Sequence, residues 1–165
     1  MPLPLPLPLP LPLPLPMPLD HAWLLAHLPH QGSMCLLDAV TEWDAQRIRC
    51  TATSHRHADN PLRAHDRLGA ACGIEYAAQA MAAHGALLAA ADGAPRAGYL
   101  ASVRSVELLV VRLDDIAADL DVEAERLSGD GNTILYGFRV SAAGRELLSG
   151  RAAVVLDADK LGSPT

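Results

Sequence analysis

Residues 67–91 read RLGAACGIEYAAQAMAAHGALLAAA, and this stretch decides the fold of the chain. Alanine is the strongest helix former because its side chain loses no conformational entropy on folding, so the stretch predicts one long helix. A helix that is apolar on nearly every side is normally buried. The stretch holds one carboxylate, Glu75, near its start, and Gln79 follows one turn later on the same face. We therefore expect a buried helix with a single acid at the centre of the molecule.

The composition describes one domain with an aliphatic core. The chain has 165 residues, of which 50% are hydrophobic and only 4% aromatic, so leucine, valine, isoleucine and alanine must supply the packing. A net charge of −6 argues against a nucleic-acid partner, because binding to phosphates needs a basic surface. The three cysteines have no C-x-x-C spacing. This pattern favours buried free thiols in a reducing cytoplasm over disulfides.

Alternating proline and leucine fill residues 1–18. Proline at every second position excludes helix and central strand, so we expect an extended or disordered extension. Such a segment suits neither a secretory signal nor a membrane span, and Met17 is a possible true start. The folded domain is expected over residues 19–157, with a polar tail over 158–165 and a cytoplasmic location.

The order of the predicted elements indicates how the long helix is covered. Short turns join the last four predicted strands, so these strands are antiparallel. About six strands are predicted, and only one long helix is available to cover them. The economical solution is an α+β hotdog fold, in which a curved antiparallel sheet wraps around the alanine-rich helix. Its edge strands predict pairing with a second subunit. The pattern gives a short helix over 20–28 and strands over 34–43, 47–53, 98–113, 120–127, 133–142 and 145–156, with a polar loop over 54–66.

Two motifs resemble a known enzyme family. Residues 28–40, LPHQGSMCLLDAV, resemble the opening motif of the 3-hydroxyacyl-ACP dehydratases of fatty-acid synthesis. Residues 73–79, GIEYAAQ, resemble the helix motif of the dehydratase-like branch in aryl polyene and xanthomonadin pigment biosynthesis. The similarity runs from about residue 24 to residue 156, and it implies that Glu75 is catalytic.

One segment departs from this family. The housekeeping dehydratases carry a Gly-His-Phe-Pro-Gly-type loop before the helix, and its histidine is the catalytic base. Here residues 60–69 read NPLRAHDRLG, which is shorter and lacks Phe-Pro-Gly. The base is therefore His30, His65 or His57, or it is absent. His30 is our first choice, because the Pro-His turn that carries it is retained.

Dehydration of a 3-hydroxyacyl thioester needs a base and an acid. A histidine suits the base, because its pKa lies near neutrality, and a carboxylic acid kept protonated by apolar surroundings suits the acid. Glu75 takes the second role only if burial outweighs the helix dipole, which favours the charged form. Backbone N–H groups at the glycine-containing helix start fit the enolate oxygen. The expected substrate-binding residues are Gly69, Cys72, Gly73 and Gln79.

Structural alternatives stand beside each of these roles. A glutamate in a first helical turn is often only a favourable neighbour of the dipole, and Gln79 or His30 can be purely structural. Cys72 can be an inert buried thiol. A metal site of His55, His57 and His65 is conceivable, but no acidic or cysteine partner has ligand spacing, so we expect no metal and no cofactor.

Three functions remain open. The first is a dehydratase-like lyase acting on substrates bound to acyl carrier protein, and the second is a hotdog acyl thioesterase. The third is a silent subunit that pairs with an active dehydratase, so the expected assembly is a homodimer or a heterodimer. Carrier protein is acidic and needs a basic landing patch, for which the candidates are Arg63, Arg96, Arg104 and Arg112.

Overall fold

A computed structural model describes residues 4, 17–92, 98–129 and 132–155 of the chain. The predicted extension over residues 1–18, the predicted turns at 92–95 and 129–132, and the tail over 158–165 lie wholly or partly outside these residues. Six antiparallel strands form one sheet in the order β1-β2-β4-β5-β6-β3. The strands are β1 (Ala39–Trp43), β2 (Arg47–Ala52), β3 (Tyr99–Leu108), β4 (Leu120–Gly129), β5 (Thr133–Ala142) and β6 (Arg145–Val155).

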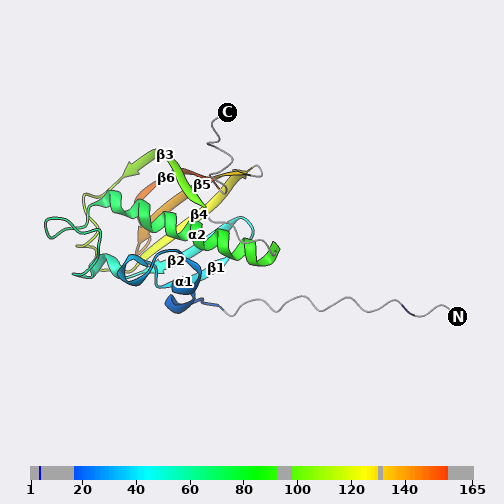
Figure 1. The fold of residues 1–165 in the computed structure, drawn as a ribbon. Helices are drawn as coiled ribbons and strands as arrows, with labels where there is room; N and C mark the ends of the chain where they lie inside the picture. Colours follow the sequence, from blue (N-terminus) through cyan, green and yellow to red (C-terminus); the bar gives the residue numbers. More distant parts are fainter. Residues whose placement is uncertain (1–3, 5–16, 93–97, 130–131, 156–165) are drawn as a thin grey trace, which may run out of the picture.

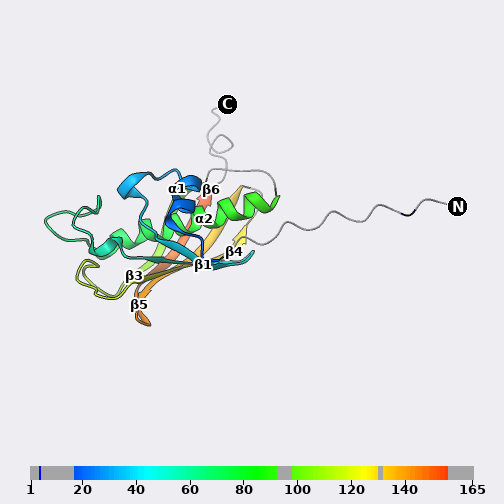
Figure 2. The same cartoon turned by 90° about the horizontal axis from the view of Figure 1, so that it is seen from below.

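Two α-helices cover one face of this sheet. The short α1 (His21–His27) and the long α2 (Gly73–Asp92) lie on the same side, and α2 runs across the strands (Figures 1 and 2). Among the described residues, neither helix is long and apolar enough to cross a membrane. The α+β prediction of one long helix against a six-stranded antiparallel sheet is confirmed.

The alternating pattern of the strands decides which side chains face α2. In β2, Ile48, Cys50 and Ala52 are buried, and their neighbours in β4 across the sheet are also buried. Burial raises the pKa of the Cys50 thiol to about 12, which keeps it protonated and inert. All three cysteines are free, as their spacing predicts.

The first half of the predicted strand over 34–43 is wrong. The chain forms a 3₁₀ turn at Gly32–Met34 and becomes a strand only at Ala39. The reason is Gln79 of α2, whose side chain is fully buried. Its Nε2 donates to the carbonyl oxygen of Met34 at 2.7 Å, and its Oε1 accepts from the backbone N–H of Leu36 at 2.9 Å. These backbone groups are therefore bonded to a side chain and not to a neighbouring strand.

The long helix and the strand after it are both shorter than predicted. A 3₁₀ turn over Ala70–Cys72 precedes α2, which begins at Gly73. A Cβ at Gly73 would lie 2.5 Å from a methyl group of the buried Leu148 in β6, so only glycine lets the helix start lie this close to the sheet. Strand β3 contains a bulge after Arg104 and ends at Leu108.

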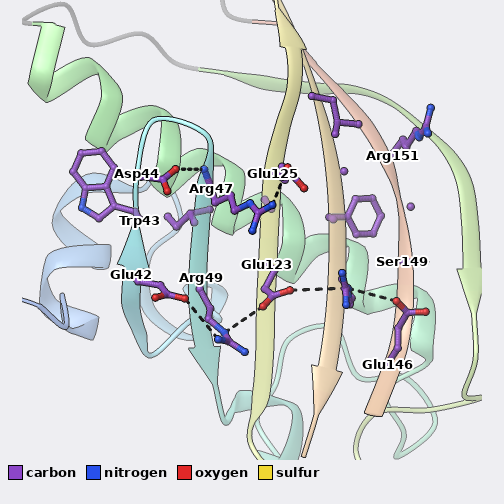
Figure 3. A pocket seen from close by; sticks show the side chains of 17 residues that line it. Glu42, Trp43, Asp44, Arg47, Arg49, Glu123, Glu125, Glu146, Ser149 and Arg151 are labelled. Atoms are coloured by element: carbon purple, nitrogen blue, oxygen red, sulfur yellow. Dashed lines mark hydrogen bonds and ion pairs between the residues drawn. The ribbon is translucent and has the colours of Figure 1, made fainter. Parts of the chain in front are cut away.

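The face of the sheet opposite to α2 carries a ladder of charges across five strands. Arg49 lies 3.6 Å from Glu42 and 3.3 Å from Glu123, and Arg139 lies 4.0 Å from Glu123 and 3.5 Å from Glu146 (Figure 3). Opposite charges on neighbouring strands favour this register over a shifted one. This part of the face is polar, and its two arginines are both paired with acidic neighbours.

The two edges of the sheet differ. At the β1 edge, Leu19 exchanges two backbone hydrogen bonds of 2.9 Å with Val40. At the other edge, no described residue pairs with the outer side of β3. Large apolar side chains are exposed along β3 and just after it, namely Tyr99, Leu100, Leu108, Leu109 and Val111. An unpaired strand edge with exposed apolar side chains is typical of surfaces at which another chain pairs.

Two buried histidines link loops to the core. The Nε2 of His55 lies 3.0 Å and 3.1 Å from the carbonyl oxygens of Ile116 and Ala118. His84 of α2 places Nε2 at 2.8 Å from the carbonyl oxygen of Asp44 and Nδ1 at 2.7 Å from the hydroxyl of Tyr136. Because carbonyl oxygens only accept, Nε2 carries the proton in both rings. Burial lowers the pKa of both imidazoles, since it disfavours the charged form.

We expect the free energy of unfolding to fall as the pH drops below about 6.5, the ordinary pKa of histidine in the unfolded chain. In that range the unfolded chain takes up protons that buried His55 and His84 resist, so acid favours unfolding. Urea titrations between pH 7.5 and pH 5 measure the effect. His84→Gln should reduce the dependence of the unfolding free energy on pH, because it removes one of the two buried imidazoles. A stability independent of pH in this window would contradict the assignment.

The Gln79 contacts give a second prediction. Gln79→Ala leaves the part-buried carbonyl of Met34 and the buried N–H of Leu36 without their Gln79 partner, so we expect it to lower the free energy of unfolding by roughly 2–4 kcal/mol. The exposed Gln46→Ala should change it by less than about 0.5 kcal/mol. Urea unfolding followed by circular dichroism compares the two variants. Equal stability of both would show that the Gln79 contacts contribute nothing.

Candidate active site

The imidazole of His30 and the carboxylate of Glu75 lie in contact. His30 Nε2 is 3.1 Å from Glu75 Oε1, within hydrogen-bond distance. The two side chains are 26% and 33% exposed, so solvent and small molecules can reach the pair. A histidine and a carboxylate at this distance form a pair that can exchange a proton.

The turn that carries His30 is fixed from both sides. Asp20 caps the start of α1 through a 2.9 Å hydrogen bond from the N–H of Trp23, and Pro29 follows its end. Gln31 then donates through Nε2 to the carbonyl oxygen of Leu25 at 2.9 Å, which satisfies a free carbonyl of the last helical turn. His30 lies between this cap and the Gln79 contacts. Its Nδ1 is buried without a hydrogen-bond partner among the described residues.

Gln79 connects the turn to the acid. Besides its bonds to the backbone of Met34 and Leu36, its Nε2 lies 3.5 Å from Glu75 Oε1. This last contact is long, so Gln79 acts mainly on the backbone and only weakly on the carboxylate. The expected interaction between Gln79 and Glu75 is present, and the stronger role is to hold the His30 segment against α2.

A buried chain of hydroxyl groups supports the same segment. Ser54 Oγ donates to the carbonyl oxygen of Leu36 at 2.8 Å and lies 2.7 Å from the hydroxyl of Tyr76. Since Ser54 Oγ donates its proton to Leu36, the Tyr76 hydroxyl must donate to Ser54. Asn60 Nδ2 in turn donates to the Tyr76 hydroxyl at 3.0 Å. Burial raises the pKa of Tyr76, so the phenol stays protonated and the chain keeps one direction.

An apolar groove of about 990 Å³ starts at this pair. Its floor is one stripe of α2 at helical spacing, Glu75, Ala78, Ala82, Gly85 and Ala89, whose members after Glu75 are only half buried. The expectation that α2 is buried all round is therefore wrong along this stripe. The walls come from α1 and the turn after it and from the ends of three strands, and include Leu28, His30, Tyr99, Leu100, Ile134, Tyr136 and Val154.

The other candidate bases lie elsewhere. His57 and His65 are exposed and do not line the groove. His65 and Asp66 have φ angles of 53° and 61° in a tight turn closed by Ala64 and Arg67. The structure therefore brings His30 to Glu75, and it brings neither His57 nor His65 there.

The N–H groups at the helix start are largely occupied within the chain. The N–H of Cys72 donates to the carbonyl oxygen of Gly69 at 3.0 Å, and the N–H of Gly73 bonds to the carbonyls of Ala70 and Ala71. Gly69, Cys72 and Gly73 are not among the residues that line the groove. Burial raises the pKa of the half-buried Cys72 thiol. Of the four predicted substrate-binding residues, only Gln79 contacts the pair.

The conceivable site of three histidines is not assembled in the part of the chain that the structure describes. His55 points its Nε2 at two carbonyl oxygens, and no group of three or more histidine, cysteine or acidic side chains in the described residues is arranged to hold a metal ion.

Three of the four arginines proposed for carrier-protein binding lie in the described residues, and their surroundings differ. Arg112 is paired with Asp114, and this arginine holds the pKa of the Asp114 carboxyl well below its usual range. Arg104 is exposed on β3 opposite Arg151, and Arg63 is only partly exposed. Arg96 lies outside the described residues.

The sequence predicts the helix stripe of the groove but not its walls. The stripe from Glu75 to Ala89 follows the i, i+3, i+7 spacing and is visible in the sequence. The contributions of Tyr99, Leu100 and Tyr136 depend on which strand ends meet the helix, and no local pattern shows that.

Comparison with solved structures shows similar folds. The dehydratase heterocomplex ApeI:P from Xenorhabdus doucetiae matches with a TM-score of 0.74 at 21% identity, covering 85% of this chain and 97% of that one. AziG from S. sahachiroi matches with a TM-score of 0.52 at 16% identity, covering 73% and 90%. A hypothetical thioesterase with coenzyme A from Streptococcus pneumoniae matches with a TM-score of 0.51 at 12% identity, covering 72% and 84%. These likenesses confirm the predicted hotdog fold.

Comparison with curated protein sequences gave no significant match. A family model described as ApeP-like, ApeP dehydratase, matches residues 24–162. This match includes the groove, His30 and Glu75, and it confirms the resemblance to the aryl polyene branch of the dehydratases. The chain belongs to the ApeP-like dehydratase family.

Proposed function

We propose that this protein removes water from 3-hydroxyacyl thioesters bound to acyl carrier protein, with His30 as base and Glu75 as acid. The observation that carries the proposal is the 3.1 Å contact between His30 Nε2 and Glu75 Oε1 at one end of an apolar groove. Membership of a dehydratase family supports the reaction type. The groove supports an acyl substrate, because its lining beyond the pair is almost entirely apolar.

The proton balance follows from this contact. In the reactive form His30 is neutral and Glu75 is protonated. His30 Nε2 takes the proton from the carbon next to the thioester carbonyl, and the electron pair of that C–H bond forms the new double bond. The C–O bond breaks, and the leaving hydroxyl takes the proton of Glu75 and departs as water.

The same contact resets the site. After the reaction His30 is positively charged and Glu75 is negatively charged, only 3.1 Å apart. The proton then passes from Nε2 directly to Oε1, which restores the starting form without solvent. This exchange requires the acid and the base to touch, as they do here.

A second hotdog subunit completes the proposed site. Glu75 is one third exposed, whereas an acid that must be protonated near neutral pH needs drier surroundings. Tyr99 and Leu100 belong both to the groove and to the open β3 edge, so a subunit paired there would also enclose the groove. The ApeI:P structure is a heterocomplex, which supports a partner of the same fold, as a second copy or a related chain. We place this assembly and its carrier-protein substrate in the cytoplasm.

The reaction is tested with purified protein and a 3-hydroxyacyl carrier protein, followed by mass spectrometry. Loss of water is expected, and Glu75→Gln and His30→Gln should each slow it by about 100-fold or more. His57→Gln and His65→Gln should keep the wild-type rate, because these side chains are exposed and outside the groove. Full activity of both Glu75→Gln and His30→Gln would overturn the assignment.

The same assay separates the competing functions. Release of the free acid would make the protein a thioesterase, in which Glu75 activates water. The similar fold of the hypothetical thioesterase with coenzyme A supports testing this alternative. A third outcome is that the chain alone is inactive and that adding a related subunit gives activity. If Glu75→Gln did not change that activity, this chain would be a structural subunit.

The partner surface gives a further prediction. Leu109→Glu, at the end of β3, should abolish association measured by light scattering, because it places a charge in the proposed interface. Leu127→Glu is the matched control, since Leu109 and Leu127 are 51% and 48% exposed and Leu127 lies on β4, away from the β3 edge. Loss of association in the control alone would assign the interface to β4.

A further inference from the structure

Gly85 lies in the interior of α2 on the stripe that faces the groove. A Cβ added there would meet no atom within 4 Å other than those of the neighbouring residues and backbone of its own helix. Gly73 in the same helix is different, because a Cβ there would lie 2.5 Å from Leu148. Close packing within the chain therefore explains the glycine at 73 and does not explain the one at 85.

Helix energetics make the glycine at 85 notable. Glycine is less favourable than alanine in a helix interior, and alanine occupies most positions around it. The φ angle of Gly85 is not in the left-handed region, so the backbone does not require glycine either. The missing side chain leaves space on one side only, which is the groove.

We infer that Gly85 determines the acyl-chain length that the groove accepts; this inference rests on the proposed function. Gly85 follows Glu75 by ten residues on the same stripe, which corresponds to about 15 Å along the helix at a rise of about 1.5 Å per residue. An extended chain advances by about 1.2 Å per bond, so a substrate needs about 12 bonds beyond the reacting carbons to reach Gly85. Hexadecanoyl chains are long enough to pass this position, and octanoyl chains end before it.

The occupant of the groove at Gly85 is the acyl chain and not a polar ligand. Beyond the His30–Glu75 pair, the helix contributes only apolar groups, namely Met81 and the small residues Ala78, Ala82, Gly85, Ala86, Ala89 and Ala90. Ile134 and Val154 face them from the sheet. The apolar groove lining begins at Glu75, the proposed acid. An acyl chain whose thioester end reacts at Glu75 therefore runs along this lining.

The test compares 3-hydroxyhexadecanoyl with 3-hydroxyoctanoyl carrier protein, in the assembly in which the wild type is active. Gly85→Leu should lower the ratio of long-chain to short-chain turnover by about 10-fold or more, because its side chain fills the groove. Gly85→Ala should lower the ratio less and should raise the unfolding temperature. Leu88→Ala, in the same helical turn but outside the groove lining, should leave the ratio at the wild-type value.

A binding assay separates this inference from the proposed reaction. Octanoic and hexadecanoic acids compete for the groove with the fluorescent conjugated acid cis-parinaric acid. Selective loss of hexadecanoic acid binding in Gly85→Leu would support the inference even if the wild type dehydrated neither thioester, a result that would overturn only the proposed function. Equal losses for both lengths would overturn the inference. So would a change in oligomeric state without a change in chain-length preference, which would assign Gly85 to a subunit contact.

Discussion

The structure of the site depends on the buried amide of Gln79. One side chain on α2 bonds to both Met34 and Leu36 in a segment that has no strand partner of its own. Unsatisfied backbone groups in this position would be costly, so the segment is bound to the helix at one height and in one orientation. His30 precedes this segment by four residues, and Glu75 precedes Gln79 by one helical turn. The amide therefore helps to hold His30 and Glu75 in contact with each other.

Sequence patterns predicted the elements that have a strong period and failed where side chains replaced backbone partners. The alternation of Ile48, Cys50 and Ala52 shows directly which face of β2 is buried, and the structure agrees. The segment around Met34 has the composition of a strand, but its hydrogen bonds go to Gln79 and Ser54. No local signal reports such a long-range contact. For the same reason the sequence left His57 and His65 open as bases beside His30, its first choice, and only the fold shows which of them lies against Glu75.

The small residues of α2 serve two opposite faces of the helix. Towards the sheet, Ala77, Ala80 and Ala83 are fully buried and let the helix lie close to the strands. Towards the groove, the same lack of volume leaves space that nothing in the described chain fills. A larger residue on the first face would push the helix away from the strands. A larger residue on the second face would take space from the groove.

The distribution of charge supports the β3 edge as the proposed place for a second subunit. On the outer face of the sheet, Arg49 and Arg139 are already paired with acidic neighbours, and covering them would remove these charges from water without a new partner (Figure 3). The β3 edge offers the reverse situation, because its free backbone groups and exposed apolar side chains gain from being covered. That edge shares Tyr99 and Leu100 with the groove. A subunit that paired with β3 would therefore also cover the end of the groove next to these two side chains, so the proposed association and the enclosure of the groove are linked.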